Sequence, residues 1–298
     1  MAQLREFRTC VLNVLLALLL TSGQVIACAQ HVSSEHHRET EMIATPCQDL
    51  SMASALREAL RLACSREHVE AESGRVRKAI ILGFVGGFVK RDDMKHPEVL
   101  FATYLQNRYG SAVHVEIFGN HEGKLAIKDI IRRLDKNNDG LLTDAEKTQT
   151  RIILYGHSWG ASQVLAFARK LQLRDIPVAL TVQIDSVKKL GQDDRRVPAN
   201  VAKAVNFYQS RGATPGQRHI VPADATRTII VGNFHMRYQH HQIKCDNYRW
   251  ISRVFNGPHH QIENDPQVWD RVTSLIDSEL LRTDAEIQRL SPLGSASQ

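Results

Sequence analysis

A strand-like run that breaks into a glycine-bracketed serine and continues as a helix is the feature that most constrains this fold. Residues 151–160 read Arg-Ile-Ile-Leu-Tyr-Gly-His-Ser-Trp-Gly, and residues 161–171 have helical character. A serine on a sharp strand-to-helix turn needs small neighbours, which Gly156 and Gly160 provide. We expect the hydroxyl of Ser158 to stand at the end of a sheet, where the first amides of the helix point toward an oxyanion. The stretch therefore predicts a nucleophilic serine.

This strand, turn and helix resemble the nucleophile turn of the α/β-hydrolase superfamily of serine esterases and lipases. The resemblance covers most of the chain after about residue 75, and the turn is its specific motif. It implies one α/β domain over residues 51–290, with a mostly parallel central sheet and helices on both faces. It also implies hydrolysis of small-molecule or lipid carboxylic esters through an acyl-enzyme, with the acid and then the base following the serine along the chain.

The acid of the implied triad has two candidates. Asp185 directly follows the strand expected at residues 176–184, in an Ile-Asp-Ser turn similar to that of a minority of the family. Asp224 lies in the loop after the strand expected at residues 204–208, where most members carry the acid. We favour Asp185 because a residue at a strand end is positioned more tightly than one in an irregular loop. A turn-capping aspartate is the alternative role for either residue.

The base is expected in a loop between the last strand, at residues 227–234, and the last helix. Asp265-Pro266 is a strong helix start, and His259 and His260 precede it. The spacing of His259 from that helix is similar to that of many family members, so we assign it the role of base and keep His260 as the alternative.

The oxyanion hole is expected at a glycine-rich loop. A buried strand at residues 79–82 runs into glycines at positions 83, 86 and 87. In the family, the loop after the third strand supplies one backbone amide, often within a His-Gly motif, and Leu82-Gly83 stands at that place here. The resemblance implies the amide of Phe84 or Val85 as one donor and that of Trp159 as the other.

A twelve-residue segment just before the serine strand matches an EF-hand calcium loop. Oxygen ligands fall at positions 1, 3 and 5, a glycine at 6, a backbone carbonyl at 7 and a bidentate glutamate at 12. The expected ligands within residues 135–146 are Asp135, Asn137, Asp139, Leu141, Thr143 and Glu146. The alternative is an acidic turn in which Thr143 and Glu146 form a capping box. We expect a structural Ca²⁺ that fixes the entry to the serine strand.

The N-terminus has the pattern of an export signal. Residues 1–29 combine Arg5 and Arg8, an apolar centre and the small-residue site Ala27-Cys28-Ala29. We expect a secreted or periplasmic protein, with a lipoprotein anchored through Cys28 as the alternative. Residues 30–50 read as a flexible leader and residues 291–298 as a loose tail. An exported chain can form a disulfide, with Cys47 and Cys64 as the nearest pair and Cys245 as a buried free thiol.

The amino-acid composition narrows the range of possible functions. The chain has 298 residues, 43% hydrophobic and 23% charged, which suits one large core. Its net charge of +6 comes from scattered Lys and Arg without interleaved aromatics, which argues against a nucleic-acid partner. No later segment reaches the length of a membrane span. Two alternatives stay open: a non-catalytic, calcium-dependent binding or surface protein, and thioester, amide or acyl-transfer chemistry at the same site.

Overall fold

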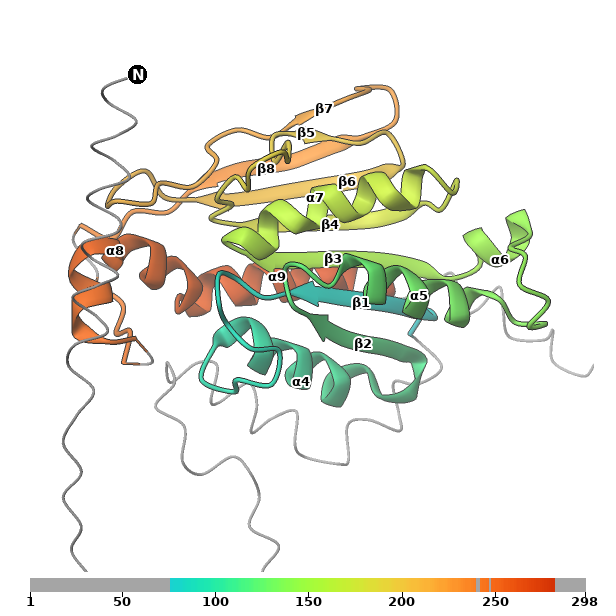
Figure 1. The fold of residues 1–298 in the computed structure, drawn as a ribbon, viewed down its shortest axis with the longest axis horizontal. Helices are drawn as coiled ribbons and strands as arrows, with labels where there is room; N and C mark the ends of the chain where they lie inside the picture. The colour runs from blue at the N-terminus through green and yellow to red at the C-terminus, as the bar shows by residue number, and fades with distance from the viewer. Residues whose placement is uncertain (1–75, 240–241, 247, 282–298) are drawn as a thin grey trace, which may run out of the picture. The chain divides into compact units, whose positions relative to one another are not determined.

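A parallel sheet of six strands forms the centre of the fold (Figure 1). The computed structural model describes residues 76–239, 242–246 and 248–281, which all belong to one compact unit. The strands run in the order β2-β1-β3-β4-β6-β8, and each neighbouring pair is parallel. Their bounds are β1 (Ala79–Phe84), β2 (Val113–Phe118), β3 (Arg151–His157), β4 (Val178–Ile184), β6 (Val201–Tyr208) and β8 (Ile229–His235). A separate two-stranded sheet joins β5 (Arg196–Val197) and β7 (Val221–Pro222).

Helices cover both faces of the sheet, as its continuous apolar strands require. On one face, α4 (Pro97–Tyr109) and α9 (Pro266–Leu280) bring Phe101 and Trp269 against Tyr155 of β3. On the other face, α5 (Gly123–Leu134) and α7 (Trp159–Gln172) pack against the sheet, with the Phe167 ring 5.2 Å from that of Phe84. The remaining helical segments are η1 (Gly110–Ala112), α6 (Asp144–Thr148) and α8 (Trp250–Glu263). The chain is therefore an α/β fold with a mostly parallel central sheet.

The alternation of side chains along β1 shows why both faces are apolar. Ile81 and Val85 point into the core under α4 and α9, whereas Ile80, Leu82 and Phe84 point into the core under α5 and α7. All six residues of β1 are buried. The strand predicted at residues 79–82 thus continues to Phe84, two residues into the expected loop.

The segment that carries His259 differs from the sequence expectation. We predicted a loop between the last strand and the last helix, but His259 lies in α8. This helix is interrupted at Asn256, where the backbone is not helical (φ −121°, ψ 25°), and Pro258 follows in the first turn after the break. Proline is tolerated in a first turn, where its missing N–H costs no intrahelical bond. The predicted start of α9 is confirmed, because the Asp265 side chain accepts a hydrogen bond from the Gln267 amide.

Several sequence predictions lie outside the described residues. They are the export signal at residues 1–29, the leader at 30–50, a helix expected at 51–64, the tail at 291–298, and Cys28, Cys47 and Cys64. Cys245 is described, and it is free and buried as expected. Within the described ranges, every helix is too short or too polar to cross a bilayer.

Candidate active site

Ser158 sits on the sharp turn that joins β3 to α7. Its backbone is in the left-handed region (φ 56°, ψ −121°), a strained conformation for a residue other than glycine. Glycine is required at both flanking positions, because other backbone atoms approach too closely to leave room for a Cβ atom. A Cβ on Gly156 would lie 2.6 Å from the carbonyl carbon of Gly160, and a Cβ on Gly160 would lie 1.9 Å from the Phe84 carbonyl oxygen. The turn expected from the sequence is therefore present at the carboxyl edge of the sheet.

The structure brings Ser158, His259 and Asp185 together in one hydrogen-bonded chain. His259 Nε2 lies 3.0 Å from Ser158 Oγ, and His259 Nδ1 lies 2.6 Å from Asp185 Oδ2. The three side chains come from the end of β3, from α8 and from the end of β4, and all three residues are buried. In such an arrangement, the imidazole can take the hydroxyl proton while the carboxylate fixes its orientation.

Asp185 is held by two donors that the sequence did not single out. The Gln209 amide donates to Asp185 Oδ1 at 3.0 Å, and Gln209 Nε2 donates to Asp185 Oδ2 at 2.8 Å. Gly216 packs against the same carboxylate, since a Cβ there would lie 1.9 Å from Asp185 Oδ1. Gln209 directly follows β6, whose end meets that of β4 at the same sheet edge. These contacts hold the carboxylate in place and aim it at His259.

The two alternative residues lie elsewhere. Asp224 precedes β8 and so stands near the amino edge of the sheet, where its side chain accepts hydrogen bonds from the Thr226 amide and hydroxyl. It is the turn-capping aspartate that the sequence allowed as an alternative. The ring of His260 stacks on that of Tyr248, with the ring centres 3.5 Å apart. Neither residue joins the hydrogen-bonded chain of Ser158.

The prediction that the amide of Phe84 or Val85 serves as an oxyanion donor is wrong. The Val85 amide donates to the Phe118 carbonyl at 3.0 Å, and Phe84 is the last residue of β1, paired with Phe118 and Gly156. β1 runs two residues longer than predicted, so Phe84 lies in the strand and the Val85 amide, directly after it, bonds to β2. The glycines that follow take their place beside the serine: a Cβ on Gly86 would lie 3.2 Å from Ser158 Cβ.

The glycine loop is fixed from two sides. Asn120 Nδ2 donates to the Gly87 carbonyl at 2.6 Å, and Lys189 Nζ in turn donates to Asn120 Oδ1 at 2.8 Å. On the other side, the Gly86 amide donates to Glu98 Oε1 at 3.3 Å. In the described part of the chain, the Gly87 amide donates no hydrogen bond. Trp159, as the first residue of α7, also has an amide without an intrahelical partner.

Buried titratable groups lie behind the serine. Glu98 and Glu263 are both 0% exposed, and burial raises the pKa of Glu98 well above its usual range and that of Glu263 to about 7. His157, which precedes the serine, stacks on His259 with the ring centres 4.7 Å apart. Burial lowers the pKa of His157 well below its usual value, so its ring is neutral. Nothing in the residue spacing of the sequence predicted that these groups meet, because they come from three separate elements.

The segment at residues 135–146 forms a compact loop between α5 and α6. Asp135 accepts from the amides of Asp139 (3.2 Å) and Gly140 (3.0 Å), and Gly140 is left-handed with φ 81°. Glu146 accepts from the Lys136 amide at 2.9 Å and the Thr143 amide at 3.0 Å. The capping box of the alternative interpretation is present, and α6 is a single turn. Leu142 packs against the core, as position 8 of such a loop should.

The oxygen donors of this loop suit a hard cation such as Ca²⁺, since three carboxylates and one amide occupy the ligand positions. The Asp135 oxygens and Glu146 Oε1 each accept one amide and keep a second lone pair, whereas Glu146 Oε2 accepts both the amide and the hydroxyl of Thr143. The carboxyl groups of Asp135, Asp139 and Glu146 do not place their ligand atoms within 4.8 Å of one another. Among the described residues, the one group of His, Cys, Asp or Glu that is gathered so closely consists of His96, Glu98 and Glu263.

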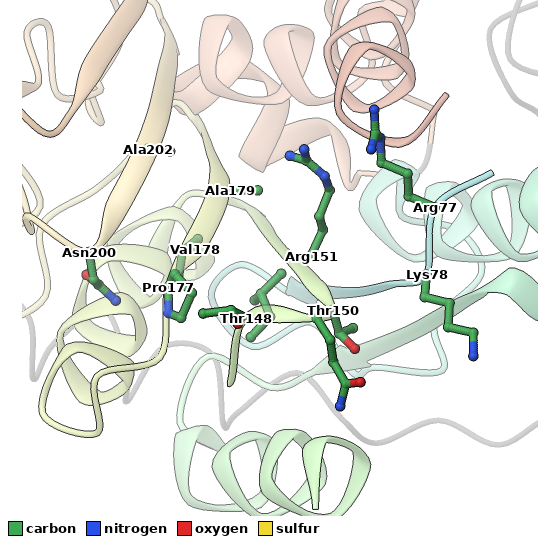
Figure 2. A pocket seen from close by; sticks show the side chains of 12 residues that line it. Arg77, Lys78, Thr148, Thr150, Arg151, Pro177, Val178, Ala179, Asn200 and Ala202 are labelled. Atoms are coloured by element: carbon green, nitrogen blue, oxygen red, sulfur yellow. The ribbon is translucent and has the colours of Figure 1, made fainter. Parts of the chain in front are cut away.

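Two large cavities flank the sheet, and neither is lined by the triad. One, of about 560 Å³, opens at the amino edge of the sheet around Arg77, Lys78 and Arg151, on the side opposite to Ser158 (Figure 2). The other, of about 670 Å³, lies beside α8 and is lined by Gln209, Arg211, Arg253 and Pro258 among others. The second cavity is nearer to the chemistry, since Pro258 adjoins His259 and Gln209 binds Asp185.

Comparison with known proteins gives no name to this arrangement. No protein-family model matches the chain, and no curated protein matches it. Among solved structures, an uncharacterized protein from Pseudomonas aeruginosa is similar, with 11% sequence identity and a TM-score of 0.36. The match covers 61% of this chain and 42% of that one, so the chain spans less than half the length of its structural neighbour. The function therefore has to follow from the site.

Proposed function

We propose that this protein is a serine hydrolase of the α/β-hydrolase type that cleaves carboxylic esters through an acyl-enzyme. The observation that supports this proposal most strongly is the hydrogen-bonded chain from Ser158 through His259 to Asp185. The strained turn at Ser158 supports it, because strain of this kind collects at functional sites. The order of the sheet supports the fold family, since the serine and acid follow neighbouring parallel strands at one edge.

Each residue has a defined role in the proposed reaction. Ser158 Oγ attacks the acyl carbon and transfers its proton to His259 Nε2, while Asp185 stabilises the imidazolium. The tetrahedral oxyanion accepts hydrogen bonds from backbone amides, and we assign these to Trp159 and Gly87. The imidazolium then protonates the departing alkoxide as its bond to the acyl carbon breaks. Water, deprotonated by His259, attacks the acyl-enzyme and releases the acid and the free serine.

The surroundings of the serine favour an apolar acyl group. Phe88 is 95% exposed, and its ring contacts that of Trp159 edge-on at 5.6 Å. Two aromatic rings next to a nucleophile offer a binding surface for an alkyl chain, because they lose little conformational freedom on binding. Small apolar esters and lipid esters are therefore the proposed substrates.

The loop at residues 135–146 is proposed to hold a structural Ca²⁺. Asp135, Asn137, Asp139 and Glu146 would bind it through side-chain oxygens, together with Leu141 through its carbonyl. Bound calcium would stabilise the loop that leads into β3. The last ligand of this loop, Glu146, lies six residues before Ile152. The ion takes no part in the chemistry at Ser158.

A series of chromogenic esters of increasing acyl length tests the proposed activity. Wild-type protein should hydrolyse them, and Ser158→Ala should lower the rate on the order of 10⁴-fold or more. Ser274→Ala is the matched control, because this hydroxyl lies on the exposed side of α9 and donates to the Asp270 carbonyl. Equal rates in wild type and Ser158→Ala would reject the hydrolase and favour a binding protein on the same fold. Parallel thioester and amide substrates identify the acyl chemistry.

A further inference from the structure

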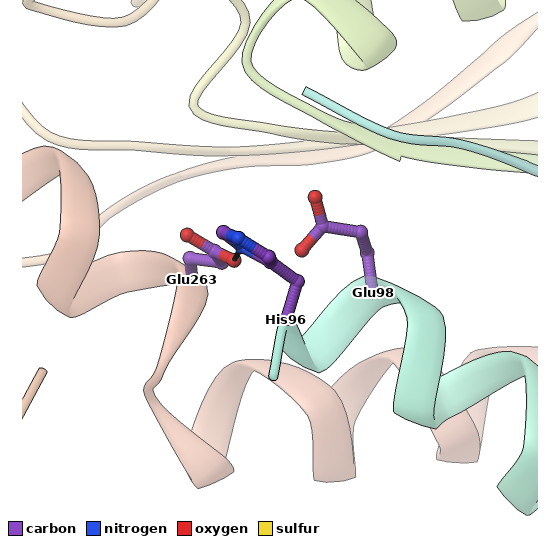
Figure 3. Close-up of side chains that lie close together, drawn as sticks. All are labelled: His96, Glu98 and Glu263. Atoms are coloured by element: carbon purple, nitrogen blue, oxygen red, sulfur yellow. Dashed lines mark hydrogen bonds and ion pairs between the residues drawn. The ribbon is translucent and has the colours of Figure 1, made fainter. Parts of the chain in front are cut away.

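Three buried side chains from two helices meet behind the glycine loop, apart from the triad (Figure 3). His96 caps α4, Glu98 lies in its first turn, and Glu263 ends α8. Each can offer one ligand atom, and these atoms all lie within 4.8 Å of one another. His96 Nδ1 lies 2.9 Å from Glu263 Oε1.

The polar groups of this cluster are not fully satisfied by the protein. Glu98 is 0% exposed, and its Oε2 atom has no N–H or hydroxyl donor among the described residues; its carboxyl group also lies within hydrogen-bonding reach of that of Glu263, and a bond between the two requires a proton. A buried carboxyl oxygen without a partner is rare and costly, and often marks the place of an ion or a water. Two carboxyl groups share the space with one imidazole, so the cluster has more acidic than basic groups. A positively charged ligand would correct both deficits.

The kind of ligand follows from the donor atoms. One imidazole nitrogen with two carboxylates suits a first-row divalent cation such as Zn²⁺, which forms bonds of about 2.0–2.2 Å to these groups. On the other side of the ring, Asp93 Oδ2 lies 3.9 Å from His96 Nε2, within ion-pair distance but too far for a hydrogen bond. Tyr248 covers the cluster: its hydroxyl contacts Glu263 Oε2 and lies 3.3 Å from His96 Nδ1. Tyr248 itself is half-buried, so it stands between the cluster and solvent.

We propose that His96, Glu98 and Glu263 form a binding site for one Zn²⁺-type divalent cation, separate from the calcium loop. The ion replaces the hydrogen bond between His96 and Glu263 and any proton that the two carboxyl groups share. Because Glu98 also binds the Gly86 amide and Glu263 follows His259 in α8, the ion ties the glycine loop to the helix of the base. The site stands independently of the hydrolase activity.

Zinc titration of the full chain by calorimetry tests the site directly. The protein is stripped with a chelator, dialysed and kept in excess calcium, so that the loop at residues 135–146 is not a competing site. The variants are His96→Gln and Glu98→Gln, the second of which keeps the shape of the buried side chain. Matched controls are His219→Gln, an exposed imidazole, and Glu116→Gln, a partly exposed carboxylate on β2.

The expected result is one zinc ion bound per chain in wild type and in both controls. In each cluster variant, affinity should fall at least about 100-fold, the upper end of the loss from removing even an outer-shell partner. Substitution with Co²⁺ should give visible ligand-field absorption in wild type that Glu98→Gln abolishes. Absence of zinc binding in wild type would overturn the proposal, as would equal binding in wild type, His96→Gln and Glu98→Gln. Circular dichroism of the stripped variants verifies that each is folded.

Discussion

His259 Nδ1 lies 2.6 Å from Asp185 Oδ2, and the same carboxylate accepts both the backbone amide and the side-chain amide of Gln209. Asp185 is 0% exposed, so these three donors replace its hydration shell. A carboxylate held in this way can fix the tautomer and the direction of the imidazole ring. The geometry therefore favours Asp185 over Asp224 as the partner of His259.

Replacing the acid should separate the two aspartates. Asp185→Asn is expected to lower kcat for ester hydrolysis about 10⁴-fold, because an amide cannot stabilise the imidazolium and favours the wrong tautomer. Asp224→Asn should leave kcat unchanged, since Asp224 binds only the Thr226 amide and hydroxyl in the turn before β8. Steady-state kinetics of the two variants give the comparison. A larger loss in Asp224→Asn than in Asp185→Asn would contradict the assignment.

Gln209 is predicted to be a positioning residue that acts through Asp185. Gln209→Ala removes one hydrogen bond to a carboxylate, worth about 1.5–3 kcal/mol, and should lower kcat roughly 10-fold or more while KM stays unchanged. Gln217→Ala is the matched control, because its side chain donates only to the His219 carbonyl. If Gln209→Ala raises KM and leaves kcat intact, the residue has a different role.

The calcium loop can be tested apart from the capping box. Removal of Ca²⁺ should lower the Tm by roughly 5–10 °C, if the ion is present at about 100 times its Kd. Glu146→Gln should abolish this calcium-dependent shift, yet it keeps the capping box, in which glutamine serves as well as glutamate. Asp144→Asn is the control, since Asp144 occupies no ligand position in the loop. If the Tm of wild type does not depend on calcium, the loop binds no structural Ca²⁺ and the capped turn is the correct interpretation.

Cys245 should be a slow nucleophile in the folded protein. Burial raises the pKa of its thiol to about 12, so at pH 8 about one thiol in 10⁴ is ionised. Alkylation should therefore be slow in native protein and should accelerate as the pH rises, whereas in denaturant it should be fast at pH 8. Mass spectrometry of the peptide that contains Cys245 follows this site separately from the other cysteines. Equal rates in folded and denatured protein would show that the thiol is exposed.

Local patterns in the sequence were enough to predict most of the strands, the turn at Ser158 and the start of α9, although not helix α8. The turn at Ser158 is encoded by two glycines whose missing Cβ atoms permit backbone contact, and α9 is encoded by Asp265, Pro266 and an apolar face. Asp185 could be favoured over Asp224 because it directly follows a strand, where a side chain is held more tightly than in an irregular loop. Each of these features depends on residues that are close together in the sequence, so one short segment contains all the information needed to predict it.

Apart from helix α8, the features that sequence reasoning missed depend on contacts between distant segments. The length of β1 is decided by the ladder with β2, which absorbs the Val85 amide expected at the oxyanion hole. The cluster of His96, Glu98 and Glu263 joins residues up to 167 positions apart, and no spacing rule connects them. Gln209 gave one usable signal, its place directly after a strand of the same sheet edge.

Covalent labelling of Ser158 tests the central claim most directly. Wild-type protein is incubated with a phosphonylating reagent, which forms a stable bond to an activated serine oxygen, and the adduct is located by peptide mass spectrometry. The proposed triad predicts one adduct on Ser158, with labelling greatly slowed in His259→Ala and abolished in Ser158→Ala. Failure to label wild type, or an adduct of equal yield on another residue in Ser158→Ala, would contradict the assignment of Ser158 as the nucleophile.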